Sequence, residues 1–136
     1  VFAWDAYVDA ALIRATLGDG AKATAELTPL IRMWERDGYR EAVAEGQLAL
    51  ARLASRADDT EGAESAARVA AEEAEAAGLP GTSWRAHAFL STLPEADPEH
   101  AIIARSIVAS LTSSLADHTL AAVLDDTLEG ELGGST

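Results

Sequence analysis

Apolar residues recur every three or four positions along most of this chain, and short polar breaks interrupt the pattern. That spacing places the apolar side chains on one face of an α-helix, where they can be buried together. No stretch alternates apolar and polar residues between turns, so we predict no β-strand. The helical pattern covers seven segments, at about 2–17, 21–36, 40–55, 61–77, 83–93, 98–115 and 118–128.

Glycine and aspartate stand at the breaks between these segments. Gly38 and Gly78 follow the second and fourth predicted helices, where a left-handed residue commonly ends a helix. The run Asp58-Asp59-Thr60 offers a cap for the fourth helix, and Asp97, which is followed by proline, can cap the start of the sixth. Asp117 is expected to cap the last helix in the same way. We therefore predict an all-α chain of about seven helices.

The breaks recur with a period near 40 residues, as the positions of Gly38 and Gly78 show. A period of this length is typical of helical solenoids. We therefore predict a single helical repeat domain over residues 1–128. Its parts are units at about 1–38, 39–78 and 79–115 and a capping helix at 117–128, followed by a flexible tail at 129–136. A generic helical bundle is the alternative, because arrays need neighbouring units to bury their faces and only three units are visible.

Two segments depart from a regular amphipathic pattern. The fourth predicted helix, 61–77, is nearly all Ala, Glu and Arg, with Val69 as its only large aliphatic residue. We expect it to be a thin outer helix that is mostly exposed. Pro29 lies inside the second predicted helix and lacks the N–H group that the helix interior needs. A kink or a local irregularity is expected there.

The stretch 18–23 (GDGAKA) resembles the turn between the two helices of a tetratricopeptide unit, in which a small residue lets the helices touch. The stretch 58–63 (DDTEGA) falls at the corresponding place of the second unit, although the first glycine is missing there. Bulky consensus residues are only partly present, with Tyr7 in the first unit and Trp84 in the third. The resemblance implies antiparallel helix pairs stacked as a right-handed superhelix.

A second resemblance concerns the C-terminal half. The stretches 84–90 (WRAHAFL), 105–111 (RSIVASL) and 114–117 (SLAD) resemble the closing helices of long-period repeat arrays. Such arrays stand at the C-terminal end of large bacterial regulators of the MalT-like and SARP-like kinds, which couple an ATPase module to a helical sensor. The resemblance implies a partner- or inducer-binding module, with the DNA-binding and nucleotide-binding parts elsewhere in the parent chain. The start at Val1, without an initiator methionine, likewise leads us to expect a piece of a longer protein.

Acidic residues dominate the charge of the chain. It carries 23 Asp and Glu against 10 Lys and Arg, which gives a formal net charge of −13 at pH 7. Nucleic-acid affinity rests on neutralising phosphates, so direct binding of DNA or RNA is disfavoured, as is binding to anionic membranes. A basic protein partner remains compatible with this charge. No apolar run approaches the ~20 residues that span a bilayer, and the absence of Cys fits a cytoplasmic protein.

Residues suited to catalysis or metal binding form no recognisable motif. The three histidines, His87, His100 and His118, are too far apart for the i, i+4 pairs that hold metals on a helix. His100 and His118 are expected at the surface. Carboxylate pairs such as Glu72-Glu73 lack a cleft that would separate their roles. We therefore expect no enzyme activity, cofactor or metal; an enzyme would need a deep polar pocket that holds His87 or His100 beside a carboxylate.

What remains is a binding surface. In tetratricopeptide arrays the first helix of each pair lines the concave face, and here these would be the first, third and fifth helices. Trp84, His87 and Ser91 share one face of the fifth helix by their spacing, although burial of Trp84 in the core is the alternative. The candidate binding residues are Asp5, Asp9, Gln47, Arg52, Trp84, His87 and Ser91.

The missing catalytic motifs predict a non-catalytic interaction module, and the second resemblance implies that it belongs to a multidomain bacterial regulator, for example one of transcription. Its partner would be a protein, a peptide, a small ligand or another domain of the parent chain. The alternative is a structural bundle that oligomerises without a dedicated ligand. A homodimer that buries the first and last helices would favour that alternative.

Overall fold

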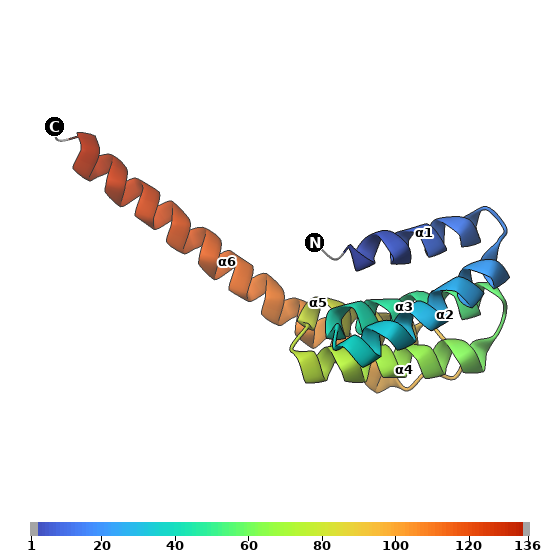
Figure 1. Ribbon diagram of the computed structural model, residues 1–136. Coiled ribbons are helices and arrows are strands. Elements are labelled where there is room, and N and C mark those ends of the chain that lie inside the picture. Colours follow the sequence, from blue (N-terminus) through green and yellow to red (C-terminus); the bar gives the residue numbers. More distant parts are fainter. Residues whose placement is uncertain (1–2, 135–136) are drawn as a thin grey trace.

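The computed structural model describes the backbone of residues 3–134 and the side chains of residues 3–120 and 123. Within these residues the chain is all-α, as predicted, with six helices and no strand. The helices, shown in Figure 1, are α1 (Trp4–Thr16), α2 (Gly20–Asp37), α3 (Arg40–Arg56), α4 (Thr60–Ala77), α5 (Pro80–Ser91) and α6 (Pro98–Gly134).

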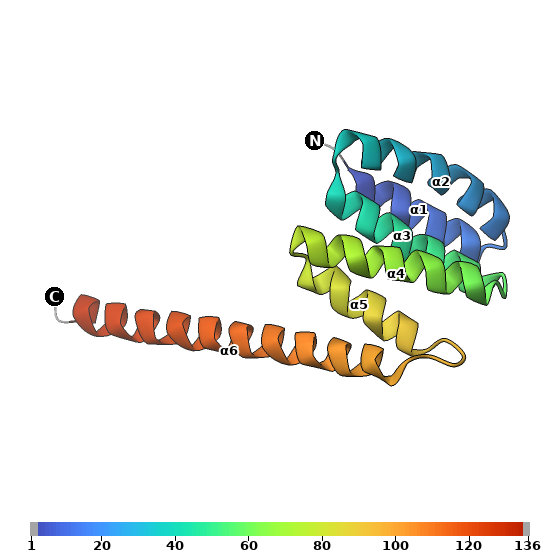
Figure 2. The same ribbon diagram turned by 90° about the horizontal axis from the view of Figure 1, so that it is seen from below.

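The first five helices form the body of the molecule. Each packs against the next one along the chain, and α3 lies at the centre, in contact with α1, α2, α4 and α5. α6 runs beside α5 and then continues beyond it, so that its second half projects from the body (Figures 1 and 2). Among the described helices, α5 is the only one that α6 contacts. The central helix is therefore held from several sides, whereas α6 is held from one.

Local signals end α2 and α4 and begin α4 and α6 where the sequence predicts them, whereas α5 begins at Pro80, three residues before its predicted start. Gly38 and Gly78 close α2 and α4 in the left-handed region, with φ of +80° and +68°. At the start of α4, the backbone N–H of Gly62 donates to Asp59 Oδ1 at 3.0 Å. At the start of α6, the backbone N–H of Glu99 donates to Asp97 Oδ1 at 2.9 Å. Both aspartates thus satisfy N–H groups that have no partner within the helix.

The helices α2 and α3 pack closely around Trp34, which is fully buried. Gly46 of α3 makes this approach possible, because a Cβ at that position would lie 2.7 Å from Cγ1 of Ile31 and 3.3 Å from Cζ3 of Trp34. Pro29, where we expected a kink or irregularity, is exposed, and α2 continues through it as one helix. Because Pro29 has no N–H group, the carbonyl four residues before it lacks its helical hydrogen bond. Since this part of α2 is exposed, water can bond to that carbonyl instead.

The helix α4 is not the thin outer helix that its composition led us to expect. It packs between α3 and α5, in clusters that include Leu48 of α3 and Leu90 of α5. Its buried residues are all alanines: Ala63, Ala67, Ala70, Ala71 and Ala74. Because the alanine side chain is a single methyl group, the neighbouring helices come close to the α4 backbone and bury it. A face of small residues can be a core face without any large aliphatic side chain.

The break predicted at Asp117 is also wrong. A single helix, α6, runs from Pro98 through Asp117 to Gly134, so the described residues contain no separate capping helix. Residues 129–134, predicted as part of a flexible tail, continue this helix, and residues 135–136 lie outside the described part. The sequence contains no Gly or Pro between Pro98 and Gly130. An aspartate caps a helix only where the chain leaves helical geometry before it, and nothing here forces that.

Candidate binding groove

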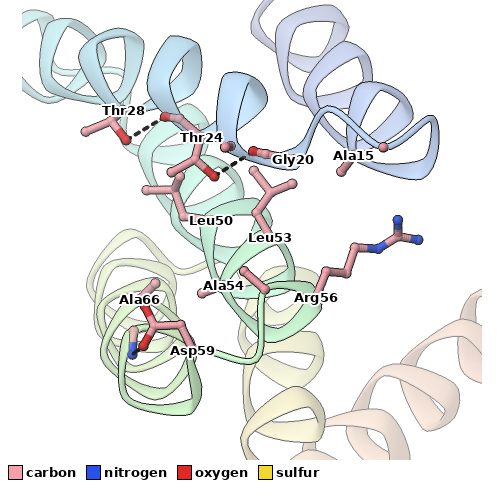
Figure 3. A pocket seen from close by; sticks show the side chains of 14 residues that line it. Ala15, Gly20, Thr24, Thr28, Leu50, Leu53, Ala54, Arg56, Asp59 and Ala66 are labelled. Carbon is pink, nitrogen blue, oxygen red and sulfur yellow. Dashed lines mark hydrogen bonds between the residues drawn. The ribbon is translucent and has the colours of Figure 1, made fainter.

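An open groove lies between α2 and α4, which do not contact each other among the described residues. Its volume is about 810 Å³. Leu50, Leu53 and Ala54 of α3 form its floor, and Figure 3 shows them between the two walls. The central helix α3 is therefore only partly covered along this strip, where Leu50 and Ala54 are half-buried and Leu53 is 3% exposed.

Small residues line both walls of the groove. On α2, Thr24 Oγ1 donates to the carbonyl of Gly20 at 3.1 Å, and Thr28 Oγ1 donates to the carbonyl of Thr24 at 2.8 Å (Figure 3). On α4, the wall consists of Gly62 and Ala66 together with the helix start. The threonine hydroxyls have used their protons within α2, so they can offer a bound molecule only acceptor lone pairs.

Charged side chains lie only at one end of the groove, where α3 ends and α4 begins. Arg56 and Asp59 line this end. Asp59 is already engaged as the cap of α4, while the Arg56 side chain extends away from the floor (Figure 3). The groove thus combines an apolar floor, small walls and a charged end, an arrangement suited to holding an apolar side chain or short segment.

A separate polar cluster joins α4, α5 and α6. His87 of α5 is buried, and its Nε2 lies 2.9 Å from Oε1 of Glu75 in α4. Its Nδ1 lies 3.0 Å from Nδ1 of His100 in α6. One imidazole must donate and the other accept in this contact, so the hydrogen bond exists only while one of the two Nδ1 atoms carries no proton. Among the described residues, no group of three side chains is placed to hold a metal ion.

A smaller hollow of about 380 Å³ lies where the loop before α6 passes α4. His100 lines it together with Glu64, Glu95 and Asp97. We expected His100 at the surface, but it is half-buried because His87 packs against it. An imidazole beside carboxylates is the arrangement that the enzyme alternative requires. The lining of this hollow contains no hydroxyl or thiol side chain that could act as a nucleophile.

A further polar contact fixes α5 against α3. Arg85 of α5 donates from Nη1 to Oε2 of Glu45 in α3 at 3.1 Å, and its Nη2 pairs with Oε1. Thr82 Oγ1 also donates to Oε1 of Glu45, at 2.8 Å. Two parallel N–H donors on one carboxylate fix orientation as well as distance. This contact holds the two helices in register and uses donors that would otherwise be open to a ligand.

The seven residues proposed from the sequence lie away from the groove, and none of them lines it. Asp5 and Asp9 are exposed on α1, and His87 is buried in the cluster described above. The half-buried members are Gln47, Arg52, Trp84 and Ser91. His87 is therefore not available beside Trp84 as an open stacking surface. The signal for the groove was present in the sequence as small residues four apart, at 20, 24 and 28 in α2 and at 62 and 66 in α4.

Comparisons with known proteins add no relative. No family model, no curated protein and no solved structure matches this chain. In the part of the chain that the structure describes, no helix is both long enough and apolar enough to cross a membrane.

Proposed function

We propose that this chain is a non-catalytic interaction module whose groove between α2 and α4 receives an apolar peptide segment flanked by basic residues. The observation that supports this is the apolar floor formed by Leu50, Leu53 and Ala54. Burying apolar surface gains roughly 25 cal/mol per Å². A partner that covers the floor therefore gains affinity without any change in the fold.

The shape of the groove favours a peptide over a small ligand. Pockets for small molecules enclose most of the ligand's surface. This groove is open to solvent on one side, so a bound molecule would remain exposed there. A segment that lays one apolar face between two helices fits that geometry. The hydroxyls of Thr24 and Thr28 can accept hydrogen bonds from its donors along one wall.

Charge favours basic flanks on the partner. The chain has a net charge of −13, so its field attracts cations and repels acidic proteins. Attraction of this kind mainly raises the association rate and specificity, and salt weakens it. An apolar segment with basic neighbours therefore matches both the floor of the groove and the surface around it.

The wider setting follows from the resemblances in the sequence. The tetratricopeptide-like turns and the MalT-like and SARP-like C-terminal stretches support a helical sensor or scaffold within a cytoplasmic bacterial regulator of transcription. The partner is then another protein or another domain of the parent chain. A structural bundle that only oligomerises is the alternative, and it predicts no saturable peptide binding in the groove.

A groove-filling variant with a matched control tests this proposal. Thr24→Trp adds a large side chain at an exposed position on the α2 wall, whereas Ala25→Trp adds it at the next exposed position, which does not line the groove. The probe is a fluorescein-labelled amphipathic helical peptide of Leu and Lys, and its control has every Lys replaced by Glu. Fluorescence anisotropy gives the dissociation constants, and far-UV circular dichroism checks that both variants are folded.

The wild-type chain and Ala25→Trp should bind the Leu–Lys peptide equally, and the Leu–Glu peptide should bind much more weakly. Thr24→Trp should weaken binding about tenfold or more, which corresponds to about 1.4 kcal/mol. Equal binding by all three proteins would show that the peptide sits elsewhere. Failure of the wild-type chain to bind the Leu–Lys peptide would contradict the proposal itself.

A further inference from the structure

One face of α6 is exposed from its first turns to the part that projects from the body. It carries residues spaced alternately by four and three, and we call it the outer face of α6: Ile102, Ser106, Ala109, Ser113, Ala116 and Leu120. All of these side chains are exposed, Ile102 at 62% and Leu120 at 59%. Alternating spacings of four and three form the heptad pattern by which two helices pack side by side.

The contact with α5 leaves the outer face uncovered. The residues of α6 that are buried or half-buried near α5 include His100, Ala104 and Ile107, which lie on the opposite side of the helix. Figure 2 shows α6 at the edge of the stack, with no other element on the side away from α5. Large apolar side chains such as Ile102 therefore face solvent along a straight, accessible helix.

The outer face is self-complementary when two copies of α6 lie antiparallel. A two-fold axis at the level of residue 111 brings Ile102 against Leu120 of the second copy, because both lie equally far from that level. The same axis sets small residues against small residues, as in Ala109 against Ser113. Helix axes approach more closely when the residues between them are small. Small residues thus fill the centre of the contact and large ones close both ends.

Charge points to a second copy of this chain as the occupant. Residues 106–116 contain no Asp, Glu, Lys or Arg, although the whole chain carries a net charge of −13. Two copies that met through most other surfaces would bring like charges together, which disfavours association. Here residues 106–116 form an uncharged helical segment that projects from the acidic body, so the centre of the contact is free of that repulsion.

The charges at the ends of the segment favour the antiparallel arrangement. It keeps the two acidic bodies at opposite ends of the contact and sets Arg105 of one copy at the level of Asp117 of the other. A parallel arrangement places both bodies at the same end and the two Asp117 side chains at the same level. Like charges near one another cost free energy, so the parallel pair is the less stable.

A second exposed strip on α6 is less suited to a second copy. Val108, Leu111 and Leu115 are exposed and continue the side of α6 that packs on α5. An antiparallel helix on this strip would soon meet α5, which already occupies that side. A parallel helix there would again bring the two acidic bodies together.

We propose that two copies of this chain associate through the outer faces of antiparallel α6 helices, centred on residue 111. The inference is independent of the groove, because no residue of α6 lines it. It gives the projecting helix a role as a dimerisation arm and leaves the binding surface of each copy accessible.

Sedimentation equilibrium of the whole chain and two charge variants tests the surface. Ala109→Glu adds a carboxylate at the centre of the outer face, and Ser114→Glu adds the same charge to an exposed residue about a third of a turn away. Both positions are exposed, so neither change disturbs the fold of one copy. The wild-type chain and Ser114→Glu should dimerise alike, whereas Ala109→Glu should raise the dissociation constant at least tenfold.

Cysteine cross-linking tests the direction, and the natural chain contains no Cys to interfere. Ala109→Cys and Ser113→Cys are made as separate chains. The antiparallel pair predicts that a mixture of the two forms a disulfide-linked heterodimer rapidly on mild oxidation, and that each chain alone cross-links poorly. Mass spectrometry identifies the linked species.

Three results would overturn the proposal. The first is a wild-type chain that stays monomeric over a hundredfold range of concentration. The second is rapid cross-linking of Ala109→Cys with itself, which requires a parallel pair. The third is a dimer that Leu111→Glu dissociates and Ala109→Glu leaves intact, because the contact would then lie on the strip that continues the α5 side.

Discussion

Replacing Gly46 in α3 by alanine should lower the free energy of unfolding, although alanine is the better helix former. The added Cβ would lie 2.7 Å from Cγ1 and 3.0 Å from Cδ1 of Ile31, and 3.3 Å from Cζ3 of Trp34. Contacts this short require a neighbour to move. Ile31 and Trp34 are 3% and 0% exposed, so both are held on all sides by the core between α1, α2 and α3.

The two opposing effects have comparable magnitudes. Replacing glycine by alanine inside a helix gains about 1 kcal/mol or less. Inserting an extra carbon into a packed core costs typically about 1–3 kcal/mol. Taking the middle of the second range, we expect a net loss of about 1 kcal/mol for Gly46→Ala.

Urea unfolding followed by far-UV circular dichroism measures this loss, and the chain offers a matched control. Gly81 lies in the first turn of α5, and a Cβ there would meet no atom within 4 Å. Gly81→Ala should therefore leave the free energy of unfolding unchanged or raise it by up to about 1 kcal/mol. In both variants the free energy of unfolding should fall with urea concentration at the same slope as in the wild-type chain, because neither change alters the surface that unfolding exposes.

Making Gly46→Ala in a chain that already carries Ile31→Ala separates the steric clash from other causes of destabilisation. The Ile31→Ala change removes Cγ1 and Cδ1, the two atoms closest to the added Cβ. In that background Gly46→Ala should cost clearly less than in the wild-type chain, because only the 3.3 Å approach to Cζ3 of Trp34 then opposes the gain in helix propensity. The reasoning is wrong if Gly46→Ala costs the same in both backgrounds, or if it stabilises the wild-type chain as much as Gly81→Ala does.

Three further predictions concern other parts of the fold. Ala70→Leu, at a fully buried position of α4, should cost about 1–3 kcal/mol in urea unfolding, while Ala76→Leu at an exposed position of α4 should stay within about 0.5 kcal/mol of the wild type. Asp59→Ala should lose about 1 kcal/mol with its cap and Asp59→Asn much less, as measured by thermal unfolding. His87→Ala and His100→Ala should show a coupling of at least about 0.5 kcal/mol in a double-mutant cycle, whereas strictly additive losses would mean that their contact contributes nothing.

Helix boundaries set by local chemistry could be predicted from the sequence. Gly38 and Gly78 close helices because a glycine adopts positive φ without strain, whatever packs around it. Asp59 and Asp97 cap helices through backbone N–H groups only two or three residues away. Signals of this kind depend on the nearest neighbours in the chain, which the sequence states directly.

The errors arise where tertiary packing decides. Ala67 and Ala70 are no more apolar than a surface alanine, so composition could not distinguish a close-packed face of α4 from an exposed one. The prediction of a break at Asp117 rests on the ability of aspartate to cap a helix. A new helix begins at such a residue only if the residues before it end the previous helix. The residues on both sides of it include no Gly or Pro, and they continue α6 instead.

The candidate sites depend even more on the arrangement of helices. His87 and His100 are thirteen positions apart and meet only because α6 folds back along α5. The groove exists because α2 and α4 both pack on α3 without contacting each other, with Thr24 on one wall and Ala66 on the other. Spacing along one helix shows which residues share a face, but it does not show which faces the neighbouring helices leave uncovered.

The central claim is that the groove between α2 and α4 is the binding surface, and NMR mapping tests it most directly. A ¹⁵N-labelled chain is titrated with the unlabelled amphipathic Leu–Lys peptide. We predict that the amide signals of Thr24, Leu53 and Ala66 shift most and saturate together. Shifts centred instead on Asp9 and Trp84, on the helices first expected to bind a partner, would contradict the claim, as would the absence of any saturable shift.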